Sequence, residues 1–184
     1  MTATAPTTVT TLARRIAAAA CRPGAFHRSD GQVLTGYFDE YLLAGDPHLL
    51  AETAAALAAL VPAGADAVAG LELGGIPIVA ALSAASGLPA LFVRKEPKTY
   101  GTRRHVEGPC AAGSRVLLVD DVVRSGAQML RAAAVLRELG AEVTGALCLV
   151  DRESGGRAAL AARGIGLHAL MTGADLDTAT GGTP

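Results

Sequence analysis

The sequence predicts an α/β domain built on a parallel sheet that helices cover on both faces. Apolar runs without polar alternation recur along the chain, amphipathic stretches separate them, and 51% of the 184 residues are hydrophobic. Continuous apolar strands are typical of parallel sheets, because helices bury both of their faces. Aromatic residues make up only 3% of the chain, so we expect a core of Ala, Leu and Val.

The first third of the chain is expected to form two helices with an irregular segment between them. Residues 12–21 predict a helix that ends at Pro23-Gly24. Residues 25–43 contain a turn and an aromatic group, formed by Tyr37, Phe38 and Tyr41. A second helix begins at Pro47, since proline is favoured in the first turn of a helix.

Strands and helices alternate through the rest of the chain. The expected strands span residues 66–73, 89–95, 114–121, 142–151 and 165–171, and the helices between them span residues 76–86, 127–140 and 155–164. Ligands of such sheets bind beyond the carboxyl ends of the strands. The candidate site residues are therefore those that follow each strand, at positions 72–75, 94–98, 120–128 and 151–156.

One long connection, residues 97–114, fits neither the helix period nor the strand period. Connections in compact domains are usually about 4–6 residues long, and longer ones are often functional. This connection carries Lys98, Arg103, Arg104 and His105. The pattern predicts a basic loop that folds over an anionic ligand, with a solvated excursion as the alternative.

The composition argues against several classes of protein. A net charge of −1 does not favour a nucleic-acid-binding surface, which needs a basic excess. The three cysteines lie far apart without a CxxC pair, so neither a disulfide framework nor a zinc site is expected. No apolar run approaches the roughly 18 residues of a membrane span. We therefore expect a cytoplasmic protein of one domain, residues 1–184, with flexible ends at 1–8 and 172–184.

The stretch 116–126, VLLVDDVVRSG, carries the strongest chemical signal. Asp120 and Asp121 end a buried strand, and residues 125–128 have the spacing of a capping box at a helix start. A helix N-terminus is a preformed anion site, and Gly126 lets a ligand approach the backbone closely. Adjacent carboxylates beside a phosphate would bind sugar hydroxyls or a divalent cation. The pattern therefore suits a sugar phosphate, unless the two acids simply face water.

Receiver domains of response regulators also place adjacent acids at a strand end, where the acids hold Mg²⁺. In those domains the acids follow the first strand, near the start of the domain. Here about two-thirds of the chain precede Asp120, and too little follows it to complete that fold. The receiver interpretation is therefore set aside.

Segment 116–126 resembles the phosphoribosyl-pyrophosphate (PRPP) signature of type I phosphoribosyltransferases. Three more segments resemble orotate phosphoribosyltransferases in order and spacing: LELGGIP at 71–77, FVRKEPKTYGTRRHVEG at 92–108 and LCLVDRESGG at 147–156. They are similar to that family's pyrophosphate loop, its catalytic loop and its Asp-Arg-Glu segment near the base pocket. The resemblance covers roughly residues 24–171. It implies the type I phosphoribosyltransferase fold, with a small N-terminal hood and a mobile catalytic loop at 97–114.

On the donor side, the resemblance implies that Asp120 and Asp121 hold the ribose hydroxyls. Asp121 and Lys98 are the implied catalytic residues. The residues implied to cradle the 5′-phosphate are Ser125, Gly126, Ala127 and Gln128, with Arg124 beside them. The residues implied to contact the pyrophosphate are Glu72, Gly74, Gly75, Arg94, Lys95 and Lys98.

On the acceptor side, the resemblance implies that Arg152 faces a carboxylate and that Tyr37 and Phe38 pack near the base. Arg124 is expected near both the phosphate and the acceptor. Mg²⁺ is the implied cofactor, with no dedicated metal ligands from the protein. The implied partners are PRPP, a nucleobase-like acceptor and a second copy of the chain, because the family's Lys98 loop reaches into a partner's site. Neither nucleic acid nor membrane is expected as a partner.

The implied activity is transfer of the 5-phosphoribosyl group from PRPP to orotate, giving orotidine 5′-monophosphate and pyrophosphate. Three departures from the family pattern bear on this activity. Arg124 replaces a usual Thr or Ser, Ser29-Asp30-Gly31 replaces a Lys-Ser-Gly turn, and Tyr100 stands where many members have His. Transfer to another heteroaromatic or carboxylated acceptor therefore stays open, as does a non-catalytic PRPP-binding regulator.

Overall fold

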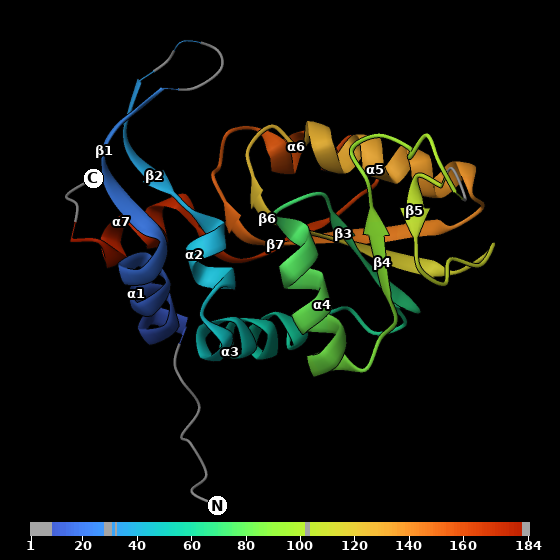
Figure 1. The fold of residues 1–184 in the computed structure, drawn as a ribbon, viewed down its shortest axis with the longest axis horizontal. Helices are drawn as coiled ribbons and strands as arrows, with labels where there is room; N and C mark the ends of the chain where they lie inside the picture. Colours follow the sequence, from blue (N-terminus) through green and yellow to red (C-terminus); the bar gives the residue numbers. More distant parts are fainter. Residues whose placement is uncertain (1–8, 28–30, 32, 102–103, 182–184) are drawn as a thin grey trace, which may run out of the picture.

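The structure is a computed structural model that describes residues 9–27, 31, 33–101 and 104–181. Its centre is a six-stranded sheet in the order β5-β4-β3-β6-β7-β8 (Figure 1). The strands are β3 (Ala67–Leu71), β4 (Ala90–Val93), β5 (Val106–Glu107), β6 (Arg115–Val123), β7 (Glu142–Asp151) and β8 (Leu167–Thr172). Neighbouring strands pair in parallel except β4 and β5, which confirms the predicted fold class.

Helices cover both faces of this sheet, as parallel strands require. One face carries α4 (Gly75–Ser86), with α3 (Pro47–Ala58) and α1 (Val9–Ala20) beside it. The other face carries α5 (Ala127–Glu138) and α6 (Gly156–Ala161), as Figure 1 shows. Within the described residues, no helix has the length and apolar character to cross a bilayer.

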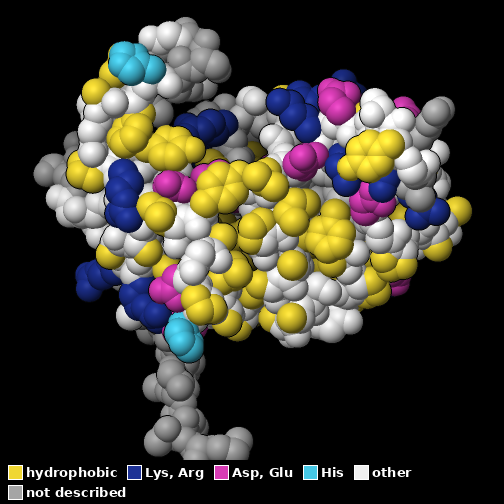
Figure 2. Space-filling model, viewed as in Figure 1, with side chains coloured by type: hydrophobic (Ala, Val, Ile, Leu, Met, Phe, Trp, Pro, Cys, Tyr) yellow, Lys and Arg dark blue, Asp and Glu magenta, His cyan; other side chains and the backbone are white. Residues whose placement is uncertain are grey.

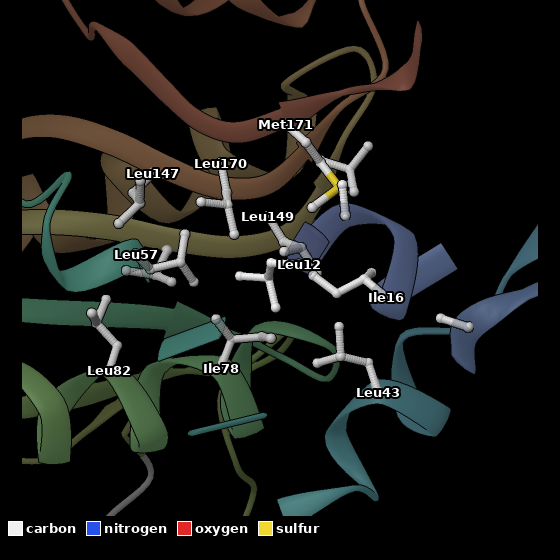
Figure 3. Close-up of a cluster of buried hydrophobic side chains, with 14 of the residues drawn as sticks. Leu12, Ile16, Leu43, Leu57, Ile78, Leu82, Leu147, Leu149, Leu170 and Met171 are labelled. Atoms are coloured by element: carbon white, nitrogen blue, oxygen red, sulfur yellow. The ribbon is translucent and has the colours of Figure 1, made fainter. Parts of the chain in front are cut away.

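The core consists of two apolar layers, one on each side of the sheet. Figure 3 shows part of one layer, which contains Ile78 and Leu82 of α4. Leu117 of β6 belongs to this layer. Its neighbour Leu118 belongs to the layer that contains Leu136 of α5. Successive strand residues point to opposite faces, so a strand covered on both sides needs an unbroken apolar run. The run in β6 stops at the acid pair, which lies near the strand's carboxyl end.

A hairpin and a short helix form the N-terminal hood (Figure 1). β1 (Cys21–His27) pairs antiparallel with β2 (Val33–Phe38), and α2 (Glu40–Ala44) follows. The sequence predicts that Pro23-Gly24 ends a helix, but α1 ends at Ala20 and both residues lie inside β1. The pairing register shifts between Pro23 and Phe26, and irregularities of this kind let proline enter an edge strand. Ser29 and Asp30 of the expected turn lie outside the described residues.

The C-terminal segment contains a helix where the sequence predicts a flexible tail. α7 (Gly173–Ala179) follows β8 and packs against α1. The Thr172 hydroxyl accepts from the Asp175 N–H at 3.1 Å, and the Asp175 carboxylate accepts from the Thr172 N–H at 2.8 Å. Leu176 is 1% exposed and belongs to the core, and the partly buried Ala179 packs against the same core layer. These two reciprocal hydrogen bonds form a capping box, which fixes the start of α7.

The long connection between β4 and β6 contains a strand that the sequence analysis missed. β5 pairs antiparallel with β4, with Glu107 opposite Phe92. The N–H groups of Arg94 and Lys98 extend this pairing, since they donate to carbonyls of residues 105 and 104 at 2.9 and 3.3 Å. A strand of two residues is too short for a periodic signal. Arg103, part of the predicted basic loop, lies outside the described residues.

Candidate active site

The candidate site lies at the carboxyl edge of the sheet, where β6 carries its acid pair. Asp120 pairs in register with Cys148 of β7 and is only 4% exposed. The Asp121 N–H donates to the Asp120 carboxylate at 3.1 Å. Burial, and then the charge of Asp121, raise the pKa of Asp120 well above its usual value. The fold thus holds a carboxyl group where its charged form is disfavoured, which is typical of functional sites.

A third carboxyl group reaches this pair from the hood. Glu40, the first residue of α2, lies close enough to Asp121 for the two carboxyl groups to interact electrostatically. Burial is the main cause that raises the pKa of Glu40, and the charge of Asp121 adds to it. The sequence analysis missed Glu40, because no local pattern links a hood residue to the end of β6. Its only signal was its place directly after the aromatic pair Tyr37 and Phe38 and Asp39.

The predicted pyrophosphate loop, residues 72–75, lies directly against the acid pair. A Cβ atom added at Gly74 would overlap the Asp121 carboxylate, 2.6 Å from its Cγ. The Glu72 carboxylate accepts from the Lys95 N–H at 2.9 Å, and the Glu72 carbonyl accepts from the Gln128 side chain at 3.1 Å. These contacts tie the loop to the ends of β4 and the start of α5. The absence of a side chain at Gly74 is what lets the loop approach Asp121.

The turn between β6 and α5 has an open helix start rather than the predicted capping box. Gly126 precedes the helix with a φ of 73°, and α5 has no side-chain cap among the described residues. The Ser125 hydroxyl accepts weakly from the Ala127 N–H at 3.5 Å, and Gln128 reaches Glu72 instead of capping the helix. The capping-box prediction is therefore wrong. Apart from the weak contact of the Ala127 N–H, the first N–H groups of α5 therefore have no recorded side-chain cap, and they lie beside a cavity of about 170 Å³ that Asp120 also lines.

The predicted cations of the catalytic loop lie elsewhere, at the far edge of the sheet. Lys98 Nζ lies 2.5 Å from Glu107 Oε1, and Arg94 Nε lies 3.2 Å from the same oxygen. Lys98 and then Arg94 hold the pKa of Glu107 below its usual value. Strands β4 and β3 separate β5 from β6, and within the described residues no recorded ion pair joins either cation to the acid pair of its own chain. Lys95 is exposed near the start of this loop.

Among the predicted acceptor residues, Arg124 lines the small cavity at the phosphate turn. The other three border a cavity of about 650 Å³ between the hood, α1 and α7. Arg152, Tyr37 and Phe38 all line it, together with Arg14, Arg22 and Asp177. The Arg152 Nε is buried and has no hydrogen-bond partner among the described residues. Because a buried N–H donor without an acceptor is costly, Arg152 is suited to receive an acidic group.

Arg124, the main departure from the family pattern, lies close enough to the hood to influence the pKa of Tyr37. Burial first, and then Glu40 and Asp39, raise the pKa of Tyr37, and the charge of Arg124 partly offsets that rise. Arg124 therefore lies near the aromatic side of the site as well as in the phosphate turn. The second departure, at residues 29–31, falls largely outside the described residues. Tyr100, the third, is 72% exposed.

Comparisons with known proteins place this geometry in a family. Residues 48–162 match the family described as "Phosphoribosyl transferase domain". The orotate phosphoribosyltransferase of Nocardioides sp. is 44% identical over 92% of this chain and 94% of its own length. The chain belongs to the orotate phosphoribosyltransferase family. The enzyme of that name from Halobacterium salinarum is 40% identical over 87% of this chain and 91% of its own length.

Solved structures of orotate phosphoribosyltransferases share the fold. The enzyme from Aeropyrum pernix superposes with a TM-score of 0.81 at 34% identity and covers 92% of this chain and 98% of its own. The Mycobacterium tuberculosis enzyme, solved with Fe(III) dicitrate, gives a TM-score of 0.83 at 29% identity, covering 91% and 98%. The type I phosphoribosyltransferase fold expected from four short motifs is thus confirmed over nearly the whole chain.

Proposed function

We propose that the protein transfers the 5-phosphoribosyl group of PRPP to orotate, giving orotidine 5′-monophosphate and pyrophosphate. The observation that carries this proposal is the buried acid pair beside an uncapped helix start. Asp120 and Asp121 offer acceptors for a ribose diol, and the amides of residues 125–128 offer donors to its 5′-phosphate. A relative from M. tuberculosis, 27% identical with a TM-score of 0.79, has been solved in complex with PRPP.

The chemistry needs stabilisation of a leaving group rather than a protein nucleophile. As pyrophosphate departs from the anomeric carbon, the ribose gains oxocarbenium character and negative charge builds on the pyrophosphate. The loop at 72–75 would hold that group beside the acid pair, and Lys98 with Arg94 would supply positive charge. Exclusion of water by the catalytic loop, which carries Lys98, would protect the ribosyl cation from hydrolysis.

Mg²⁺ fits the site as a companion of PRPP. The described residues contain no group of three His, Cys, Asp or Glu side chains that could hold a metal ion. Mg²⁺ commonly binds through one or two carboxylates together with substrate phosphate oxygens and water. Asp120 and Asp121 are the carboxylates beside which such an ion would lie, and the ion would neutralise charge on the leaving pyrophosphate.

The acceptor would enter from the hood side, through the cavity that Arg152 and Tyr37 both line. The planar guanidinium of Arg152 matches a carboxylate such as that of orotate. Phe38 is buried and Tyr37 is partly exposed, so Tyr37 offers the accessible aromatic face. Arg124 would add a second cation on this side, which suits an acidic acceptor.

A test of the proposed reaction measures pyrophosphate release from Mg²⁺-PRPP with a panel of bases. Orotate is expected to give the highest kcat/KM, and uracil, which lacks the carboxylate, is expected to be at least about 100-fold poorer because Arg152 is left unpaired. Turnover that prefers a neutral base would reassign the acceptor. Absence of turnover with every base would refute the enzymatic proposal and leave a PRPP-binding regulator.

We propose further that the enzyme is a homodimer with shared active sites. Lys98 forms an ion pair with Glu107 of β5, a strand that lies three positions from β6 in the sheet, about 14 Å away at the usual strand spacing. A second copy offers a partner site that the loop carrying Lys98 could enter.

Mixing inactive Lys98→Ala protein with inactive Asp121→Asn protein tests this arrangement. Shared sites predict recovery of up to roughly one quarter of wild-type activity, because random pairing gives half mixed dimers with one intact site each. Size-exclusion chromatography with a tag on each variant would verify the mixed dimers. A verified mixed dimer without recovered activity would show that each chain has a self-contained site.

A further inference from the structure

Glu107 is the only acid for which the described structure records ion pairs to cations of the catalytic loop. One oxygen of its carboxylate lies 2.5 Å from Lys98 Nζ and 3.2 Å from Arg94 Nε. The Lys98 side chain is only 17% exposed as a result of this packing. Both cations are the groups that the proposed reaction needs at the pyrophosphate, so in this structure they are engaged by a carboxylate of their own chain.

The two sides of this contact differ in how they are anchored. Glu107 belongs to β5, whose other residue, Val106, is buried in the core layer that contains α5. Lys98 belongs to the loop that leaves β4, and besides the ion pair with Glu107 the described structure records a long backbone hydrogen bond from its N–H to the carbonyl of residue 104, at 3.3 Å. Tyr100, two residues on, is largely exposed. Movement of Lys98 toward a ligand would therefore leave Glu107 in place.

We propose that Glu107 is a positioning residue that holds Lys98 and Arg94 in the resting loop and yields them to pyrophosphate. This inference rests on the proposed function. Pyrophosphate carries more negative charge than a single carboxylate, so it can displace Glu107 from both cations. Each cation then exchanges one anionic partner for another and is never left without a counter-charge. After the reaction, Glu107 competes with the bound pyrophosphate for the same cations and so favours product release.

The sequence offers an unusually clean readout, because Lys95 and Lys98 are its only lysines. Lys95 is exposed, so it serves as an internal standard for the ion-paired Lys98. Brief acylation of the native protein with acetic anhydride, followed by mass spectrometry, gives the relative labelling rate of the two amines. In Glu107→Gln the Lys98:Lys95 ratio is expected to rise at least threefold, because the amide has the same shape but no charge to hold the ammonium group.

Binding of pyrophosphate supplies the second readout. Calorimetry with Mg²⁺-pyrophosphate is expected to give a dissociation constant at least threefold lower for Glu107→Gln than for the wild type, because the anion no longer displaces a carboxylate. Product inhibition by pyrophosphate should strengthen by the same factor. A merely structural role for Glu107 would weaken binding or leave it unchanged. Glu96→Gln is the matched control, because it removes the same charge from an exposed position two residues before Lys98.

The outcomes separate this role from the proposed function. If the wild type binds no pyrophosphate, both the role of Glu107 and the proposed function are refuted. If the wild type binds it and Glu107→Gln binds it no more tightly, or if the labelling ratio does not change, only the role of Glu107 is refuted. Equal effects of Glu96→Gln would also refute it, since general charge would then be the cause. Should Glu107→Gln fail to fold, Glu107→Asp retracts the carboxylate by one methylene and is expected to shift both readouts in the same direction by a smaller factor.

Discussion

Asp120→Asn is expected to lower kcat/KM for PRPP about 100-fold while raising the melting temperature. A hundredfold loss corresponds to about 3 kcal/mol, which is the upper end for a hydrogen bond to a charged group. The gain in stability follows from the pKa of Asp120, which burial and Asp121 raise above its value in the unfolded chain. A group of this kind stabilises the fold fully below its unfolded pKa, and that contribution is lost as pH rises through its folded pKa. An asparagine cannot ionise and does not suffer this loss.

The difference in melting temperature between Asp120→Asn and the wild type should therefore grow from acid to neutral pH. Thermal unfolding at several pH values, alongside steady-state kinetics, measures both effects. Asp66→Asn is the matched control from the opposite, amino edge of the sheet. Its carboxylate is held by Arg115, whose hydrogen bonds lower the pKa of Asp66, so this variant should melt lower at neutral pH and retain full activity. A stable, fully active Asp120→Asn protein would contradict the assignment of the acid pair to the donor.

Gly74→Ala is expected to reduce kcat/KM for PRPP by about 100-fold with little loss of stability. The added methyl group would overlap the Asp121 carboxylate, so either that side chain or the loop at 72–75 must move. Displacement of a substrate-positioning group by about 1 Å can cost about 100-fold in rate. The side chain of Asp121 is partly exposed and can rotate away, which is why the fold itself tolerates the change.

Steady-state kinetics and chemical unfolding of Gly74→Ala separate the two effects. Gly166→Ala is its control, because a Cβ at Gly166 meets no atom within 4 Å, and activity and stability should both remain near wild type. Retention of kcat/KM within twofold in Gly74→Ala would show that close approach of the loop to Asp121 is not needed. Loss of folding in Gly74→Ala alone would place the role of this glycine in the fold rather than in the site.

The elements with strong periodic signals were predicted well from sequence. The strand at 114–121 and the helix at 127–140 correspond to β6 and α5 within a few residues. A strand covered on both faces needs a continuous apolar run, and an amphipathic helix needs a periodic one, so both patterns are visible in the local sequence. The elements that were missed have weak local signals. β5 has two residues, and α7 depends on one reciprocal cap and one buried leucine. The hood hairpin was missed because its strands are largely exposed and interrupted by Pro23.

The sequence by itself determined the fold class and the family, and it led to the proposed donor site, because these depend on motifs in which neighbours along the chain act together. Asp120 with Asp121 and the glycine-containing turn after them are such motifs. Only the tertiary structure decided which distant groups meet them. It brought Glu40 of the hood to Asp121, turned Gln128 toward Glu72 instead of the helix cap, and paired Lys98 with Glu107 at the sheet edge. Such contacts depend on how elements pack in three dimensions, and no spacing within a local segment records them.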